Sequence, residues 1–236
     1  MDKVLWVVSY NSLSKFVQRA KAAKVTAVAI RTSNDVAQAI PAFHGEGMKV
    51  YGWRWPSAKP VPAMNEANRA VTLFAKGMDG YFADPEGEPG KPWDWNQAGL
   101  DQLADDFCSA IKSAAGGKPF GTTSHYLGKQ VFPKLPWASF FNHTDVFLPQ
   151  AYWRVAGGVV FHGKPAENYQ RSIQTWLQTG AVQGKIQPMA GELVHVNGLE
   201  IEQYAAEAVN QNVPVLHFYT DENGIDPAVW DAIAQA

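Results

Sequence analysis

The sequence predicts an α/β fold, a single closed (β/α)8 TIM barrel that spans residues 1–236 as one catalytic domain. Short β-rich runs alternate with helical patterns eight times without a linker, which is typical of a parallel sheet. The chain length of 236 residues also suits a barrel of about 200–250 residues. A doubly wound open sheet is the alternative. However, the first strand–helix junction, Ser9-Tyr10-Asn11-Ser12-Leu13, has no nucleotide-binding glycine loop.

Each predicted strand is short and rich in Val, Ile, Phe, Tyr or Trp, as a strand buried on both faces should be. The strands are predicted at residues 4–9, 26–31, 49–55, 80–84, 119–124, 145–151, 185–190 and 213–219. Apolar residues at helical spacing lie between them. These patterns predict helices over residues 14–22, 65–76, 100–111, 168–178 and 200–210, and a last helix that begins at Pro227.

Composition excludes several classes of function. Twenty Lys and Arg against 22 Asp and Glu leave no basic surface for nucleic acid and no polybasic patch for a membrane. Cys108 is the only cysteine, so no internal disulfide can form, and its place on the apolar side of a helix indicates packing. No apolar run approaches the roughly 18 residues of a membrane span, and no signal peptide is evident. We expect a cytoplasmic monomer, unless another system releases it to the cell wall.

Active sites of such barrels lie at the carboxyl ends of the strands. The residues expected there are polar and aromatic, which suits a sugar site because rings stack on sugars and amides bond hydroxyls. The alternative for the aromatic members is simple core packing. The candidate substrate-binding residues are Arg31, Trp53, Trp55, Tyr126, Gln150, Trp153, Gln187 and Tyr219.

Two acids follow the fourth strand, in the segment Gly80-Tyr81-Phe82-Ala83-Asp84-Pro85-Glu86. Side chains alternate along a strand, so Phe82, Asp84 and Glu86 share one face. If Phe82 points into the barrel, both acids point toward its opening. Two close and partly buried carboxylates should raise one pKa, which gives the acid and base needed to cleave a glycosidic bond. The alternative is that these acids cap the next helix, but that helical pattern begins only near Leu100.

The fourth-strand segment resembles the D-G-x-D-x-D-x-E signature of family 18 glycoside hydrolases, the chitinases and related enzymes. Asp79, Gly80, Asp84 and Glu86 match, whereas Phe82 stands where that family has an acid. The resemblance implies that Glu86 protonates the leaving oxygen and that Asp84 orients the acetamido group of the substrate. Tyr152, in the Gln-Ala-Tyr stretch that resembles the sixth strand of this family, would then bond the acetamido carbonyl.

A second resemblance is to family 25 muramidases, which include many phage lysins. These enzymes also carry an Asp-x-Glu pair after the fourth strand, and residues 28–31 and 50–56 look like their second and third strands. Their usual first-strand Asp is missing here, and Asp221 would be the eighth-strand acid. Separately, Glu192 follows the seventh strand, where other retaining glycosidases place a nucleophile.

Other chemistries are less well supported by the sequence. No H-x-x-x-H or cysteine pair occurs, so we expect no metal and no cofactor, although a metal bound by acids and histidines at the rim remains an alternative. Ser124 precedes His125 without a G-x-S-x-G motif. The sequence favours a glycosidase that acts on an N-acetylhexosamine polymer, either peptidoglycan or a chitin-like polysaccharide. The alternatives are an inactive glycan-binding barrel and a structural component of a phage or cell-wall assembly.

Overall fold

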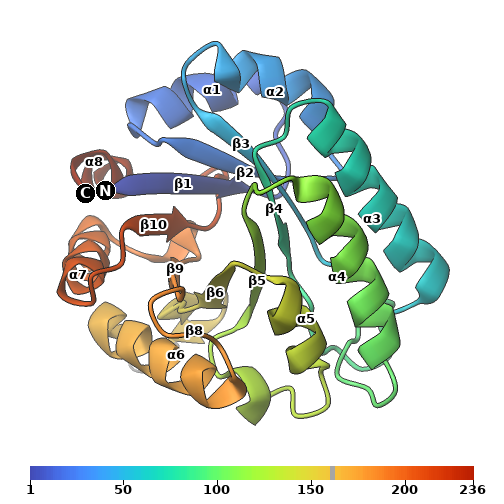
Figure 1. Ribbon diagram of the computed structural model, residues 1–236. Helices are drawn as coiled ribbons and strands as arrows, with labels where there is room; N and C mark the ends of the chain where they lie inside the picture. The colour runs from blue at the N-terminus through green and yellow to red at the C-terminus, as the bar shows by residue number, and fades with distance from the viewer. Residues whose placement is uncertain (160–162) are drawn as a thin grey trace.

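The computed structural model describes residues 1–159 and 163–236 and confirms the α/β barrel. Eight parallel strands follow one another in the order β6-β5-β4-β3-β2-β1-β10-β9. A parallel bridge between Phe147 and Ile186 joins the two ends of this sheet, so the strands form a barrel (Figure 1). The strands are β1 Asp2–Val7, β2 Ala27–Arg31, β3 Lys49–Arg54, β4 Gly80–Ala83, β5 Phe120–His125, β6 Val146–Gln150, β9 Met189–Ala190 and β10 Val215–Phe218.

Helices surround the strands on the outside of the barrel (Figure 1). They are α1 Leu13–Ala22, α2 Val36–His44, α3 Pro60–Ala75, α4 Asp101–Ala115, α5 Trp137–His143, α6 Pro165–Thr179, α7 Gly198–Asn210 and α8 Pro227–Gln235. The sequence patterns predicted six of these helices and left α2 and α5 without bounds. A small antiparallel hairpin, β7 Arg154–Val155 with β8 Gly158–Val159, was not predicted.

Local sequence signals explain where several helices begin and end. Asn197 caps α7 in a reciprocal arrangement with Glu200, and Asp226 caps α8 just before Pro227. Helix α4 ends at Gly116, which has a left-handed φ of 58° and can adopt it because glycine lacks a Cβ. Leu100 is the residue that precedes α4, as the apolar pattern indicated.

The barrel interior is filled by alternate residues of the strands, because successive side chains point to opposite faces. Trp6, Trp53 and Phe82 are almost fully buried there. The Trp6 and Phe82 rings stack with centroids 5.1 Å apart, and Trp6 meets Trp53 at 5.5 Å. The expectation that Phe82 points inward is therefore confirmed, and the next inward position on its strand belongs to Asp84.

The two chain ends lie side by side (Figure 1). Asp2 of β1 pairs with Val215 of β10. The ammonium of Lys3 donates hydrogen bonds to the carbonyls of Ile233 at 2.8 Å and Ala234 at 3.3 Å. A cation at the last carbonyls of a helix is favourable, so Lys3 fixes α8 against the first strand.

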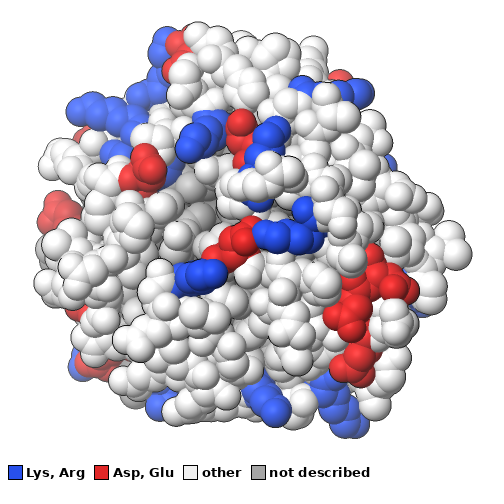
Figure 2. Space-filling model, in the orientation of Figure 1, with Lys and Arg blue, Asp and Glu red and all other residues white. Residues whose placement is uncertain are grey.

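Three surface and core properties bear on function. In the described part of the chain, no helix has the length and apolarity that crossing a membrane requires. On the face shown in Figure 2, acidic and basic side chains lie next to each other near the centre, and a separate group of acidic side chains lies at the right. Cys108 is buried within α4, as expected for a packing residue.

Candidate active site

The acid pair lies just beyond the end of β4. The Asp84 amide donates to the Arg54 carbonyl at 2.8 Å, so Asp84 continues the pairing of β4 with β3. Between the acids, the Pro85 carbonyl accepts a hydrogen bond of 2.7 Å from Ser124 Oγ. The Glu86 carbonyl accepts another of 2.7 Å from the Trp95 amide. The backbone that carries both carboxyls is therefore held from both sides.

Gln150, the last residue of β6, joins the two acids. Its Nε2 donates to Asp84 Oδ1 and to Glu86 Oε1, both at 3.0 Å. One side-chain amide can make both contacts because it carries two N–H donors. The sequence predicted that Gln150 lies at the mouth, and the structure places it against the acid pair.

Both carboxyls have raised pKa values. Burial, opposed by the contacts with Asp84 and Gln150, raises the pKa of Glu86 to about 7, and the charge of Glu88 adds to the rise. Burial, followed by the charge of Glu86, raises the pKa of Asp84 well above its ordinary value, while the Trp55 indole opposes this rise. Burial disfavours the charged form of an acid, and two adjacent acids disfavour double ionisation. The pair therefore retains a proton near neutral pH.

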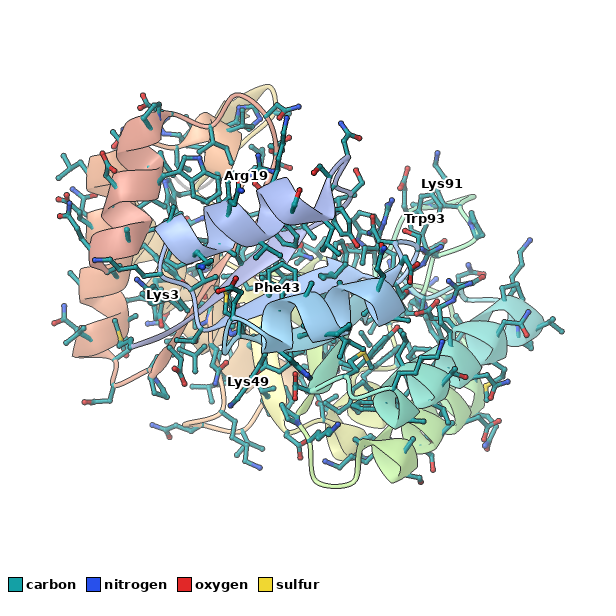
Figure 3. All side chains as sticks on the ribbon, turned by 90° about the horizontal axis from the view of Figure 1, so that it is seen from above. Lys3, Arg19, Phe43, Lys49, Lys91 and Trp93 are labelled. Atoms are coloured by element: carbon teal, nitrogen blue, oxygen red, sulfur yellow. The ribbon has the colours of Figure 1, made fainter. Side chains whose placement is uncertain are left out.

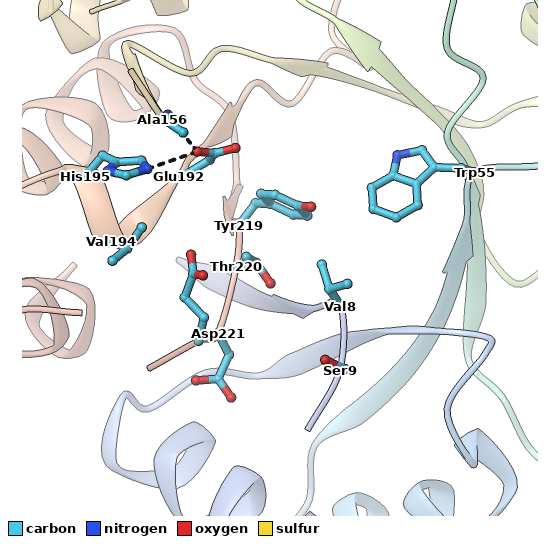
Figure 4. Close-up of a pocket in the computed structure, with 11 residues that line it drawn as sticks. Val8, Ser9, Trp55, Ala156, Glu192, Val194, His195, Tyr219, Thr220 and Asp221 are labelled. Carbon is cyan, nitrogen blue, oxygen red and sulfur yellow. Dashed lines mark hydrogen bonds and ion pairs between the residues drawn. The ribbon is translucent and has the colours of Figure 1, made fainter. Parts of the chain in front are cut away.

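Two cavities share Trp55 in their linings, and the smaller of them is also lined by Glu86. One has a volume of about 510 Å³ and is lined by Val8, Ser9, Tyr219, Glu192 and neighbouring loop residues. Figure 4 shows the Trp55 and Tyr219 side chains projecting into the space between the surrounding loops. The other cavity has a volume of about 470 Å³ and is lined by Arg31, Arg54, Trp55, Glu86, Gly87, Glu88 and Trp93.

Trp93 shows at which end of the barrel the second cavity lies. In Figure 3, Trp93 and Lys91 lie in the upper part of the view, whereas Lys49, the first residue of β3, lies in the lower part. The end that carries Trp93 is therefore the end where the parallel strands finish. It is also where active sites of such barrels occur.

Tyr152 is a partly buried residue close to the acid pair and to Tyr219. Its ring stacks on Tyr219 with centroids 5.5 Å apart and an interplanar angle of 12°. Burial raises its pKa well above the ordinary value, and Tyr219 and the nearby acids raise it further. Gly191 permits this packing, because a Cβ there would come within 2.6 Å of the Tyr152 ring.

Glu192 lines the larger cavity from the loop after β9, whereas Glu86 lines the other cavity. The Glu192 carboxylate accepts a hydrogen bond from the Ala156 amide at 3.1 Å and lies 3.3 Å from His195 Nε2 (Figure 4). These contacts join the β7–β8 hairpin to the rim. Glu192 thus lies at the mouth, as expected, and its charge acts on Tyr152 together with the charges of the acid pair.

Three aromatic candidates lie away from the open surface. Trp53 and Trp153 are fully buried, and Tyr126 is 9% exposed. Trp53 donates its indole N–H to the Val7 carbonyl inside the barrel, and the Trp153 ring packs on Tyr204 at 5.8 Å. These rings have no free face for a sugar, which corrects the expectation that they bind substrate by stacking. Composition alone could not separate them from Trp55.

Two polar candidates, Gln187 and Asp221, make structural contacts with other side chains. His217 has its pKa lowered by burial to about 3, so it is neutral, and its Nε2 lies 2.9 Å from Gln187 Oε1. Gln187 therefore lies half-buried against His217, two residues before β9 rather than after it, which corrects its assignment to the mouth. Asp221 borders the larger cavity, but both of its oxygens lie 2.8 Å from the Arg19 guanidinium.

The sequence reading missed two contributors to the smaller cavity. Trp93 comes from the long loop between β4 and α4, where no periodic pattern places a side chain. Arg54 falls within the third predicted strand, at residues 49–55, and was not chosen as a binding residue. Arg31, which was chosen, lies with its Cζ 5.6 Å from the centroid of the Trp55 ring. Within residues 1–159 and 163–236, no cluster of three or more His, Cys, Asp and Glu side chains could hold a metal ion.

Fold and site together define an eight-stranded parallel α/β barrel with a buried carboxyl pair at its mouth. No family model matches the chain, and no curated protein matches it significantly. Several solved structures, in contrast, match its fold. The PgaB (BpsB) glycoside hydrolase domain from Bordetella bronchiseptica is 11% identical, with a TM-score of 0.65 over 99% of this chain and 98% of its own.

Two further matches show the range of enzymes with this architecture. A class V chitinase from Pseudomonas fluorescens Pf-5 is 10% identical, with a TM-score of 0.65 over 98% of each chain. A protein from Toxoplasma gondii ME49 that is assigned as a deoxyribose-phosphate aldolase is 12% identical, with a TM-score of 0.59 over 99% of this chain and 94% of its own. Because the fold hosts different chemistries, these likenesses establish the barrel, and the function has to be argued from the site.

Proposed function

We propose that the protein is a glycoside hydrolase that cleaves a polymer containing N-acetylhexosamine, with Glu86 as the proton donor. The observation that carries this proposal is the arrangement of Asp84, Gln150 and Glu86 at the barrel mouth. Glu86 borders an open cavity, and its pKa is raised to about 7. An acid with such a pKa holds a transferable proton near neutral pH. The glycoside hydrolases among the fold neighbours support the same choice of chemistry.

The proposed reaction uses Glu86 in two directions. As the glycosidic C–O bond breaks, its electron pair stays on the leaving oxygen, which takes the Glu86 proton. The Glu86 carboxylate then accepts a proton from the water whose oxygen bonds to the anomeric carbon. Gln150 holds the carboxylate in place throughout, because its amide bonds Glu86 Oε1. Asp84 and Tyr152 lie beside Glu86 and would orient the sugar that is cleaved.

The two cavities together suit a chain of sugars. Trp55 belongs to both cavities, and Tyr219 lines the larger one. Flat rings of this kind stack against sugar faces, while Glu86 lines the adjoining cavity. We infer that the polymer lies across both cavities, with the cleaved bond near Trp55.

The test is to incubate the protein with purified peptidoglycan and with chitin, assay new reducing ends and identify their type. We expect reducing ends from at least one polymer, and their loss in Glu86→Gln. Glu202→Gln is the matched control, because it makes the same chemical change at an exposed residue of α7. Equal activity of wild type and Glu86→Gln would exclude the proposed donor.

One observation favours a second function, a glycan-binding protein without turnover. Phe82 occupies the inward position below Asp84 and stacks on Trp6, so no acid lies there to exchange a proton with Asp84. A pure binding protein would bind the oligosaccharides by calorimetry and release no reducing ends even as wild type. Binding without turnover would therefore support this second function over the first.

A further inference from the structure

The smaller cavity contains two arginines that make no ion pair within the described residues. Arg31 ends β2 and Arg54 ends β3, and both line this cavity with Glu86. Throughout the described residues, neither guanidinium has an ion pair or a side-chain hydrogen bond, although Arg19, Arg69 and Arg154 each have one. Arg31 Nε is buried and has no acceptor within that same part of the chain. A buried donor without a partner is costly, so this pair needs an explanation.

The two acids that line this cavity, Glu86 and Glu88, do not pair with the arginines in the described part of the chain, and the charge of Arg54 acts instead on the buried Glu66, where it opposes the rise in pKa that burial causes. Glu88 is engaged elsewhere, because its carboxylate accepts from the Trp93 indole at 3.1 Å and lies 3.6 Å from the Lys91 ammonium. The pKa of Glu86 is raised, and the groups that lower it are Asp84 and Gln150 rather than an arginine. The pKa of Arg31 is lowered by burial and then by the charge of Arg54. The two cations therefore repel each other across the cavity.

We propose that Arg31 and Arg54 form a subsite for a carboxylate carried by the sugar next to the cleaved bond. A guanidinium matches a carboxylate with two parallel hydrogen bonds, and a bound carboxylate would relieve the repulsion between the arginines. Trp55 lies under Arg31 and borders the same cavity, so the sugar ring and its carboxylate can be held together. The carboxylate comes either from an ether-linked acid on the amino sugar or from a peptide attached to it.

This inference rests on the proposed function for its catalytic use, but its test is a binding measurement. Calorimetry would compare three glycans of equal length on the intact protein. The first is a chitin oligosaccharide without carboxylates. The second is a peptidoglycan glycan strand with free lactyl carboxylates, and the third is the same strand with its stem peptides attached. The same glycans would be measured on Glu86→Gln, in which turnover is removed.

We expect a carboxylated glycan to bind about 10- to 100-fold more tightly than the neutral one, the range of one or two charge-assisted contacts. Tighter binding of the second glycan identifies the lactyl carboxylate as the source, and tighter binding of the third identifies the peptide. Arg31→Gln and Arg54→Gln should each reduce this preference about tenfold or more. Arg171→Gln, at an exposed residue of α6, should leave it unchanged.

Equal affinity for all three glycans, or a preference that survives in both arginine variants, would overturn the inference. If a variant does not fold, the salt dependence of the wild type decides. Preference for the carboxylated glycan should fall with rising sodium chloride concentration, whereas binding of the neutral glycan should not. A protein that hydrolyses nothing but shows the arginine-dependent preference would refute the proposed function and keep this subsite.

Discussion

Two acids at the amino end of the barrel and the Asp84–Glu86 pair at its mouth have different partners. At the amino ends of the strands, Asp79 accepts a hydrogen bond from the Val50 amide at 2.8 Å and lies 2.7 Å from His44 Nε2. Asp145 likewise accepts from the Phe120 amide at 3.0 Å and pairs with Lys112. At the carboxyl ends, Asp84 and Glu86 share one neutral amide, that of Gln150.

The difference separates structural from functional acids. At the amino end, each of these carboxylates accepts from a backbone amide and has a second partner, His44 or Lys112, which stabilises the fold. At the carboxyl end, burial without a cation leaves both pKa values raised. Uncompensated groups cost stability and are expected at sites of chemistry. The following variants test this contrast, from the largest expected effect to the smallest.

Glu86→Gln should have the largest effect on turnover. Removing a general acid typically costs about 10²- to 10⁴-fold in rate, while the amide keeps the shape of the side chain. The measurement is the initial rate of reducing-end release at pH 6, approximately one unit below the Glu86 pKa of about 7. A loss of less than about tenfold would place the donor elsewhere.

The same variant should be more stable than wild type at alkaline pH. The folded-state pKa of Glu86 is raised from 4.5 to about 7, so the folded protein binds the proton more tightly than the unfolded chain does. This stabilising contribution is complete below the unfolded pKa and is lost as pH rises through about 7. Urea unfolding at pH 8 should show Glu86→Gln more stable by about 2 kcal/mol. The difference should vanish near pH 4, and a constant difference at both pH values would contradict the assignment.

Asp79→Ala should show the opposite behaviour at the amino end. It removes the acceptor of the Val50 amide and the partner of His44, which should cost about 1–2 kcal/mol of unfolding free energy. Turnover of the folded fraction should stay within about twofold of wild type, because Asp79 does not touch the site. Urea titration and initial rates, taken on one preparation, separate these effects. A large loss of turnover with unchanged stability would reverse the roles of the two ends.

Gln150→Ala should produce the smallest shift. Gln150 lowers the pKa of Glu86 through its hydrogen bond, so its removal should raise that pKa further and move the alkaline limb of the kcat/KM profile upward. We expect a shift of about 0.5 to 1 pH unit, the order of one lost hydrogen bond. A downward shift would mean that Gln150 stabilises the protonated form.

The sequence predicted the barrel and the place of the acid pair because both depend on strong local periodicities. Alternation from Phe82 to Asp84 is a property of any strand, and the structure confirms it. Burial of aromatic residues was less predictable: Trp53 and Trp55 lie on the same face, but only the first is below the rim. The partner of Asp221 also escaped prediction, since Arg19 comes from α1, 202 residues away in the sequence.

The shortest strand of the barrel, β9, has a consequence for the order in which the protein opens. It contains only Met189 and Ala190, and a single bridge joins the segment before it to β6. Few hydrogen bonds there resist local separation, so amide protons on this side should exchange with solvent before those of β1 to β4. Gln150 is the last residue of β6, on one side of this junction, and Gly191 directly follows β9, on the other side. Bound glycan should therefore slow exchange on this side most, which would make hydrogen exchange a direct reporter of substrate engagement.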